Sequence, residues 1–248
     1  IFITLWLIIL LIVYTILTQK ASNLVYGDKK YYPNISRSLW VSLFFLSIFY
    51  FLMLIIAPTP HFYTIYGLYS SETIHNLRLV LSFLFIIYFL YLKVERSSCT
   101  FYSFEFYIIL FFSFLSLNLI LISCTLLNLF IFIELFSLCT YFLLITNKKS
   151  PKTIEASIKY FIFGSASSSF LLFGFCLLYL RTGAQDLFDI SLLTYNNNFF
   201  TEDPYFLLAA SLISFSFLLK IGASVFFFWM ADVYEGANYP LLIYFNTF

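Results

Sequence analysis

The stretch Leu126–Leu138 reads LLNLFIFIELFSL, an apolar run that contains a single acidic residue, Glu134. The run continues to residue 146, and about 20 largely apolar residues are enough for a helix to cross a membrane. A charge at the centre of such a helix costs about 2.5–3.5 kcal/mol on insertion scales. Glu134 lies about 12 Å along the helix, near the midplane. It therefore indicates a functional site, with a structural ion pair or a bond to a neighbouring hydroxyl as the alternative.

The whole chain has the composition of an integral membrane protein. Of its 248 residues, 62% are hydrophobic and 10% are charged, whereas about 25% of the residues in a soluble domain are charged. The formal net charge of +1 gives no sign of a nucleic-acid partner, and membrane lipids are the expected surroundings. The 35 Phe and 20 Tyr residues are typical of an AT-rich genome, such as that of an organelle.

Apolar segments of sufficient length predict seven membrane-spanning helices and the start of an eighth near Leu241. We therefore expect an all-α polytopic membrane protein, with three peripheral helices in residues 1–100 and a second unit in residues 101–248. The chain stops eight residues into the last apolar run, which is too short to span. The seven predicted spans are roughly 1–18, 39–57, 77–93, 101–123, 126–146, 155–181 and 205–230.

Basic residues are distributed unevenly between the two sides of the predicted topology, and this bias sets orientation. The loops and helix ends on one side hold nine Lys and Arg residues, whereas the other side holds Arg78 and Arg181. The basic side should face the matrix or cytoplasm, with the N-terminus on the opposite, intermembrane-space side. The nine residues are Lys20, Lys29, Lys30, Arg37, Lys93, Arg96, Lys148, Lys149 and Lys152.

Two lysines also lie within predicted spans. Lys220, in the run SFLLKIGASVFFFW, is separated from water on one side by about 15 Å of helix, too far for its side chain to reach the interface. We expect a functional role for it, and Gly222 should weaken the helix beside it. Lys159 is near a helix start. It is either part of a functional site or simply paired with Glu155, at the favourable i,i+4 spacing.

No motif predicts a metal site or a cofactor in this chain. His61 and His75 have no third ligand nearby in the sequence. The cysteines lack the spacing of a metal cluster or a disulfide framework, and we expect them to be small core residues. They are Cys99, Cys124, Cys139 and Cys176.

Three motifs occur in an order and spacing that resemble a known family. They are LNLFIFIELFSLCTYFLLI, EASIKYFIFGSASSSFLLFGFCLLYLRTG and FLLKIGASVFFFWMADVYEGA. Together they resemble the antiporter-like subunit 2 family of respiratory NADH:ubiquinone oxidoreductase (complex I), over about residues 101–240. The resemblance implies a fold of fourteen helices with two inverted five-helix repeats, each containing one broken helix. Residues 101–248 would be the first repeat, with helices four to seven and the start of helix eight.

The resemblance also implies roles for individual residues. Glu134, Lys220 and Lys159 match the ionisable residues of proton translocation, and Gly222 lies at the expected helix break. The family's proposed mechanism has the lysine change protonation as its pairing with the glutamate forms or breaks. FMN, iron–sulfur clusters and quinone are implied elsewhere in the complex, with no cofactor in this chain.

The sequence departs from the family pattern after Lys220. Val225-Phe226-Phe227-Phe228-Trp229 replaces the usual Pro-Phe-His-Phe-Trp, and Ala231 replaces a proline. The helix break therefore depends on Gly222. The second repeat is also missing, so we expect a second chain to supply the remaining helices.

The sequence thus predicts a membrane-arm subunit of a proton-pumping NADH:ubiquinone oxidoreductase in the mitochondrial inner membrane, with other membrane-arm subunits as its partners. Two alternatives remain open. The chain could belong to a cation/proton antiporter that shares the glutamate and lysine, or it could be a structural remnant that no longer pumps.

Overall fold

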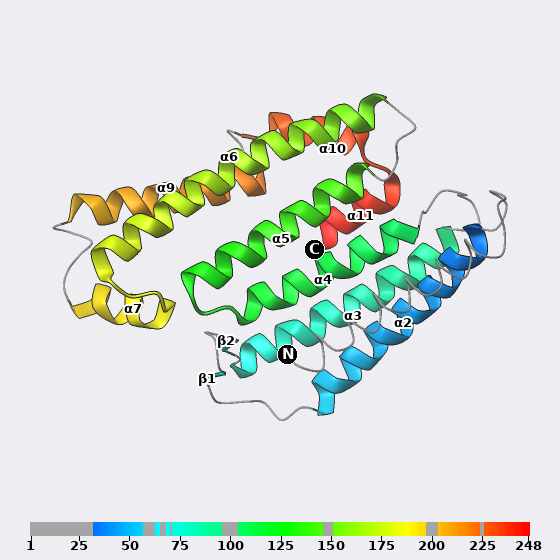
Figure 1. Cartoon of the computed structure of the whole chain (residues 1–248), viewed down its shortest axis with the longest axis horizontal. Coiled ribbons are helices and arrows are strands. Elements are labelled where there is room, and N and C mark those ends of the chain that lie inside the picture. Colours follow the sequence, from blue (N-terminus) through cyan, green and yellow to red (C-terminus); the bar gives the residue numbers. More distant parts are fainter. Residues whose placement is uncertain are drawn as a thin grey trace, which may run out of the picture.

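A computed structural model describes residues 32–56, 63–64, 68–69, 71–95, 104–145, 151–196, 203–223 and 226–248. The predicted span 1–18 lies outside these residues. The described part contains nine helices and one short antiparallel pair of strands, β1 and β2 (Figure 1). The helices are α2 (Tyr32–Ile56), α3 (Glu72–Glu95), α4 (Phe104–Ile122), α5 (Leu126–Ile145), α6 (Pro151–Thr182), α7 (Leu187–Asn196), α9 (Pro204–Ile221), α10 (Phe228–Gly236) and α11 (Tyr239–Thr247), and the strands are Tyr63–Thr64 and Leu68–Tyr69.

The helices confirm the prediction of an all-α polytopic membrane protein. Within the described residues, four stretches are long and apolar enough to cross a membrane, namely residues 72–92 of α3 and all of α5, α6 and α9. Helices α2 and α4 contain shorter apolar stretches. Large apolar side chains remain exposed on the helices, as at Ile56 (74%) and Leu180 (75%). A surface of this kind suits a lipid environment, where apolar side chains need no polar cover.

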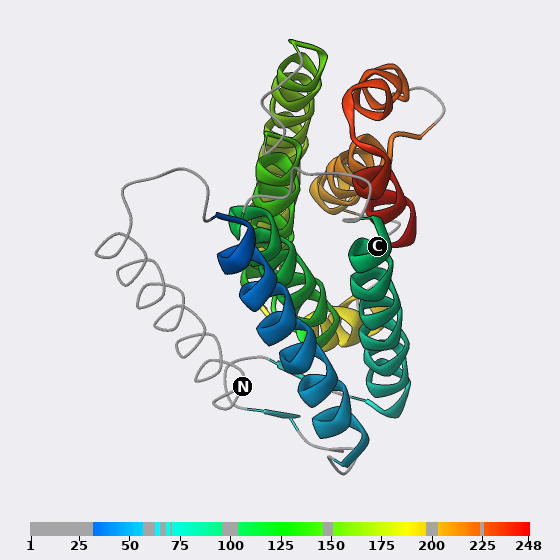
Figure 2. The same ribbon diagram turned by 90° about the vertical axis from the view of Figure 1, so that its right-hand side faces the viewer.

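The helices pack side by side in sequence order, from α2 and α3 through α4 and α5 to α6 and α9 (Figures 1 and 2). One buried cluster joins α2, α3 and α4 to α10 and α11. Its centre is the stack of Phe85 on Phe114, with ring centroids 4.0 Å apart. A second cluster lies among α5, α6, α7 and α9. Because α6 belongs to the second cluster and also packs against α10, it links the two halves of the molecule.

The span expected over residues 205–230, with a break at Gly222, forms two helices in the structure. Helix α9 ends at Ile221, and α10 begins at Phe228. Gly222 has a left-handed backbone (φ 67°, ψ 47°), and its N–H donates to the Leu219 carbonyl while the next N–H donates to Leu218. This is the Schellman arrangement, which favours glycine because a Cβ is strained at positive φ. The helix therefore ends here without a proline.

Two further predictions need correction. Cys124 and Cys139 are partly buried, but Cys176 is exposed on α6 and is not a core residue. His75, which precedes the predicted span 77–93, lies in the first turn of α3 and is buried. Cys99 and His61 lie outside the described residues.

A tight contact between α6 and α9 gives a prediction about stability. A Cβ at Gly174 would lie 2.6 Å from Ile213 and 3.2 Å from the Ala209 carbonyl oxygen. Gly174→Val should therefore force the helices apart and destabilise the fold by about 1–3 kcal/mol, the usual cost of overpacking. Thermal unfolding of the detergent-solubilised protein would measure the loss. Ser165→Val is the matched control, because Ser165 is exposed on the same helix; equal stability of the two variants would contradict the packing.

Candidate functional site

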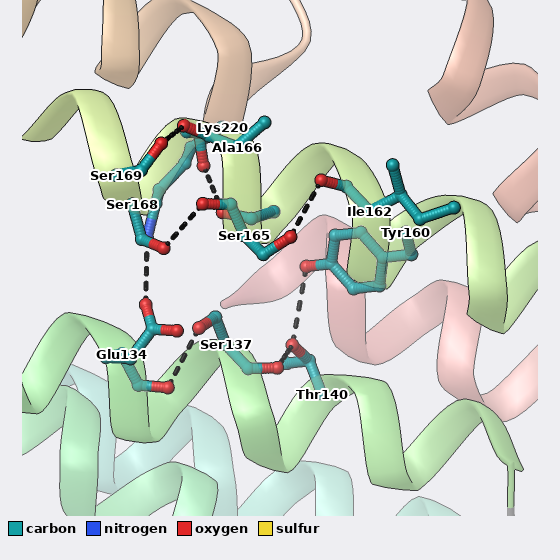
Figure 3. A network of polar contacts seen from close by, with 12 residues as sticks. Glu134, Ser137, Thr140, Tyr160, Ile162, Ser165, Ala166, Ser168, Ser169 and Lys220 are labelled. Carbon is teal, nitrogen blue, oxygen red and sulfur yellow. Dashed lines mark hydrogen bonds and ion pairs between the residues drawn. The ribbon is translucent and has the colours of Figure 1, made fainter.

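Helices α5 and α9 bring Glu134 and Lys220 together. Lys220 Nζ lies 3.9 Å from Glu134 Oε2, and the two side chains are 17% and 29% exposed. Neither of these two atoms has a hydrogen-bond partner among the described residues. The separation is too long for a direct hydrogen bond, so the atoms form an ion pair with a gap that one water molecule could bridge. Figure 3 shows the pair between the α5 and α6 ribbons.

The break after Ile221 accounts for the position of the lysine. Lys220 lies in the last turn of α9, where carbonyl groups point beyond the helix end and carry a partial negative charge. A cation is favoured there, whereas in an unbroken helix it would have no such stabilisation. Broken helices use the same property to hold cations at mid-membrane in transporters. Gly222 thus contributes to the site through the backbone.

The pair is balanced between two opposing electrostatic effects. Two unit charges about 4 Å apart attract by about 4 kcal/mol at an effective dielectric constant of 20. Removing each charge from water costs several kcal/mol. The net effect therefore depends on the distance between the two charged groups and on the hydration of Glu134 and Lys220.

A small cavity adjoins the lysine. It has a volume of about 100 Å³ and is lined by Lys220 and by residues of α5, α6 and α10. We call it the lysine cavity. Its wall includes polar groups that suit water, which needs about 30 Å³ per molecule. The other lining residues are Ile133, Phe136, Ser137, Tyr141, Tyr160, Phe163, Gly164, Ser167, Leu219 and Trp229.

Hydroxyl groups extend from the pair along α5 and α6 (Figure 3). Ser137, one turn after Glu134, donates to the Glu134 backbone carbonyl at 2.8 Å. The Thr140 hydroxyl then donates to Ser137 O at 2.7 Å and contacts Tyr160 Oη at 3.4 Å. Tyr141 fits because position 164 is glycine, where a Cβ would collide with the tyrosine hydroxyl. These groups offer donors and acceptors to water in the lysine cavity.

Lys159 occupies a different place from the Glu134–Lys220 pair. Its Nζ lies 2.7 Å from Glu155 and 2.6 Å from Asp232, and its side chain is 36% exposed. Lys152 similarly pairs with Glu235 at 2.6 Å. The structure thus includes the expected Lys159–Glu155 contact and adds a partner from α10. These residues line a second cavity of about 110 Å³, which we call the charged cavity.

Sequence reasoning did not find the α10 residues of the two cavities, Trp229, Asp232 and Glu235. A signal was present on α6, where the cavity-lining positions recur at the three- and four-residue spacing of one helix face. In order, these positions are 152, 155, 156, 159, 160, 163, 164 and 167. They mark the face that α10 covers.

No group of three or more His, Cys, Asp or Glu residues is placed to hold a metal ion within the described part of the chain. The groups present at the Glu134–Lys220 pair suit acid–base chemistry, because a half-buried carboxylate and an ammonium group lie beside a small cavity with hydroxyl groups in its wall. Ionisable residues at a break in a membrane helix are a feature of transporter folds.

Comparison with known families agrees with this class. Residues 123–247 match the family described as NADH:quinone oxidoreductase/Mrp antiporter, transmembrane. The chain belongs to this family, and the matched region contains both members of the Glu134–Lys220 pair.

Bacterial relatives are similar over part of the chain. It is 33% identical over 162 residues to NADH-quinone oxidoreductase subunit N of Cytophaga hutchinsonii, covering 65% of this chain and 34% of that protein. It is 37% identical over 143 residues to subunit N 2 of Acidobacterium capsulatum, covering 58% of this chain and 28% of that protein. The chain thus matches about a third or less of each relative's length.

Solved structures share the fold. The structure of respiratory complex I from Thermus thermophilus with bound aureothin contains a chain that matches with a TM-score of 0.70 and 20% identity, covering 96% of this chain and 49% of that one. An archaeal membrane-bound sulfane sulfur reductase gives 0.74 and 19%, covering 99% and 50%. The Mrp complex from Dietzia sp. gives 0.67 and 18%, covering 85% and 41%. The described fold thus corresponds to about half of each of these chains.

The ion pair gives a prediction about stability. Glu134→Gln should leave the Lys220 ammonium buried without its counter-charge and destabilise the protein by about 1–3 kcal/mol. Replacing both residues, as Glu134→Gln with Lys220→Met, removes both charges and should cost less than the sum of the single changes. A double-mutant cycle of thermal stability in detergent would measure the coupling. Strict additivity would contradict an interaction between the two side chains.

Proposed function

We propose that this chain is a membrane-arm subunit of a proton-pumping NADH:ubiquinone oxidoreductase and that Glu134 and Lys220 take part in proton translocation. The observation that supports it most is the 3.9 Å ion pair at the broken end of α9, inside the region that matches the family. Ionisable residues within a membrane are costly and usually mark a path for ions or protons.

The chemistry of the proposed step is a proton transfer within the pair. When Lys220 and Glu134 are close, both are charged and stabilise each other. Transfer of one proton from Lys220 Nζ to Glu134 Oε2, directly or through a bridging water, leaves a neutral amine and a neutral carboxylic acid. Movement of α9 relative to α5 would shift this balance, because attraction between the charges falls with distance while their desolvation cost remains. Lys159 would contribute a third ionisable group at the exposed end of α6.

We also propose partners and a cellular location for the chain. Its partners would be other membrane-arm subunits and the helices that complete the antiporter-like fold, since the relatives extend well beyond the matched region. FMN, iron–sulfur clusters and quinone would be bound by other subunits. We also propose a mitochondrial inner-membrane location, with the basic loops in the matrix. This part of the proposal is supported by the sequence resemblance and by the Phe- and Tyr-rich composition. The relatives named above are prokaryotic proteins and do not bear on it.

A cation/proton antiporter is the second candidate, favoured by the fold shared with the Mrp complex. Purification of the native assembly separates the two. Complex I requires this chain to co-purify with flavin- and iron–sulfur-containing subunits. An assembly that lacks both groups and exchanges Na⁺ for protons would support the antiporter instead.

Proton transport gives the functional prediction. Glu134→Gln and Lys220→Met should each lower the number of protons translocated per NADH oxidised, because each removes a group that holds a proton. Assembled complex in sealed vesicles, with a pH-sensitive dye and parallel NADH oxidation, would measure this ratio. Glu72→Gln is the control, since Glu72 is an exposed acid at the start of α3. An unchanged ratio in fully assembled variants would instead support a structural remnant without pumping.

A further inference from the structure

Helix α10 runs antiparallel to α6 and covers the face that carries both cavities. Gly236, at the end of α10, approaches so closely that a Cβ there would lie 2.8 Å from the Lys152 carbonyl oxygen. One turn earlier on α10, Asp232 pairs with Lys159. One turn earlier again, Trp229 stacks on Tyr160. Successive turns of α10 therefore lie against successive turns of α6, from the charged cavity inward.

Trp229 lines the lysine cavity and lies one turn of α10 from Asp232, which lines the charged cavity. Its ring is 5.4 Å from that of Tyr160, nearly parallel at 13°, and 6.1 Å from that of Phe163. The tryptophan is 5% exposed and lines the lysine cavity together with Lys220. Tyr160 directly follows Lys159, which lines the charged cavity. An aromatic layer therefore separates an exposed charged cavity from the buried lysine.

The indole of Trp229 retains a polar group on its buried side. Its Nε1 is buried without a hydrogen-bond partner among the described residues, although buried tryptophans usually find one. Lys220 lines the same cavity, and its Nζ is likewise buried without a hydrogen-bond partner among the described residues. The residues that carry these two donors line one cavity, where water would satisfy such groups.

Two ion pairs fasten α10 in this position. Lys152 binds Glu235 and Lys159 binds Asp232, both at 2.6 Å. Each pair is exposed and contributes little stability alone. Both pairs connect α6 to α10, and they therefore fix the register in which Trp229 stacks on Tyr160. A change in either pair would move the aromatic layer.

From this arrangement we propose that Trp229 is a gate between the charged cavity and the lysine cavity, and that the Lys152–Glu235 and Lys159–Asp232 pairs hold it closed. With the gate open, water joins the two cavities and Lys220 exchanges protons with the solution at the basic end of α6. The inference rests on the proposed function for its biological meaning, but access of water past Trp229 is a separate physical property. It is measurable in the resting complex.

The test uses a thiol placed inside the lysine cavity. Ser167 lines this cavity and is fully buried, and cysteine is close to it in size. In a chain whose native cysteines are serine, Ser167→Cys should react slowly with a small cationic methanethiosulfonate added on the side of the charged cavity. Adding Trp229→Ala should speed the reaction at least about tenfold, because thiol reactivity depends on access to water. Trp229→Phe, which keeps an aromatic ring, should leave it slow.

Controls separate a gate from general loosening. Ser169→Cys lies two residues further on, at an exposed position of α6, and its reaction rate should not change with Trp229→Ala. Asp232→Asn with Glu235→Gln should speed labelling of the cavity thiol while Trp229 is intact. The variant with Lys152→Glu and Glu235→Lys exchanges the two charges of one pair and leaves Lys159–Asp232 intact. Its cavity thiol should be labelled as slowly as with the native pairs. Mass spectrometry of this chain, in complex shown to be assembled, would give the rates.

Equal labelling of the cavity thiol with Trp229 and with alanine would overturn the gate, whether both rates were fast or slow. Proton translocation is measured separately. A gated thiol in a complex that does not pump would leave the gate standing and reject the proposed function, and an ungated thiol in a pumping complex would do the reverse.

Discussion

The structure depends on keeping two opposite charges together inside apolar helices. Neither Glu134 nor Lys220 would be stable alone at this depth, and the 3.9 Å separation of their charged atoms offsets part of the cost of burying both. The pair also constrains the backbone. Helix α9 ends one residue after Lys220, and Gly222 takes the left-handed conformation that allows the chain to turn away. The site therefore depends on the end of α9 as well as on the two charged side chains.

Ending α9 at this point has consequences for the rest of the fold. The chain after Gly222 forms α10, which continues along α6 in the same direction as α9 and closes the lysine cavity with Trp229. The contacts of α10 divide into a charged part near the exposed end and an aromatic part near the lysine. In the proposed gate, the charged end of α10 is in contact with water, and the aromatic end keeps water away from Lys220.

Some of this was predictable from the sequence. Glu134 and Lys220 stand out because charged residues are rare in apolar spans, and the spans follow from length and hydropathy. A break at Gly222 within the span 205–230 was expected from the glycine and the resemblance, and α9 ends at that residue. The apolar run did not show that the chain would continue as a separate helix, α10. Asp232 as a partner of Lys159 was also missed, since the two are 73 residues apart in sequence and meet only through the packing of α10 on α6. The roles of Glu134, Lys220 and Lys159 remain predictions.

The proposed proton transfer requires Glu134 to change its protonation state during turnover. Infrared difference spectroscopy of the assembled complex, comparing resting enzyme with enzyme oxidising NADH, reports protonated carboxyl groups through their C=O stretch. We expect a carboxyl band that appears or disappears with turnover and is lost in Glu134→Gln but retained in Glu72→Gln. Difference spectra that are identical in the native complex and in an active, assembled Glu134→Gln complex would contradict it.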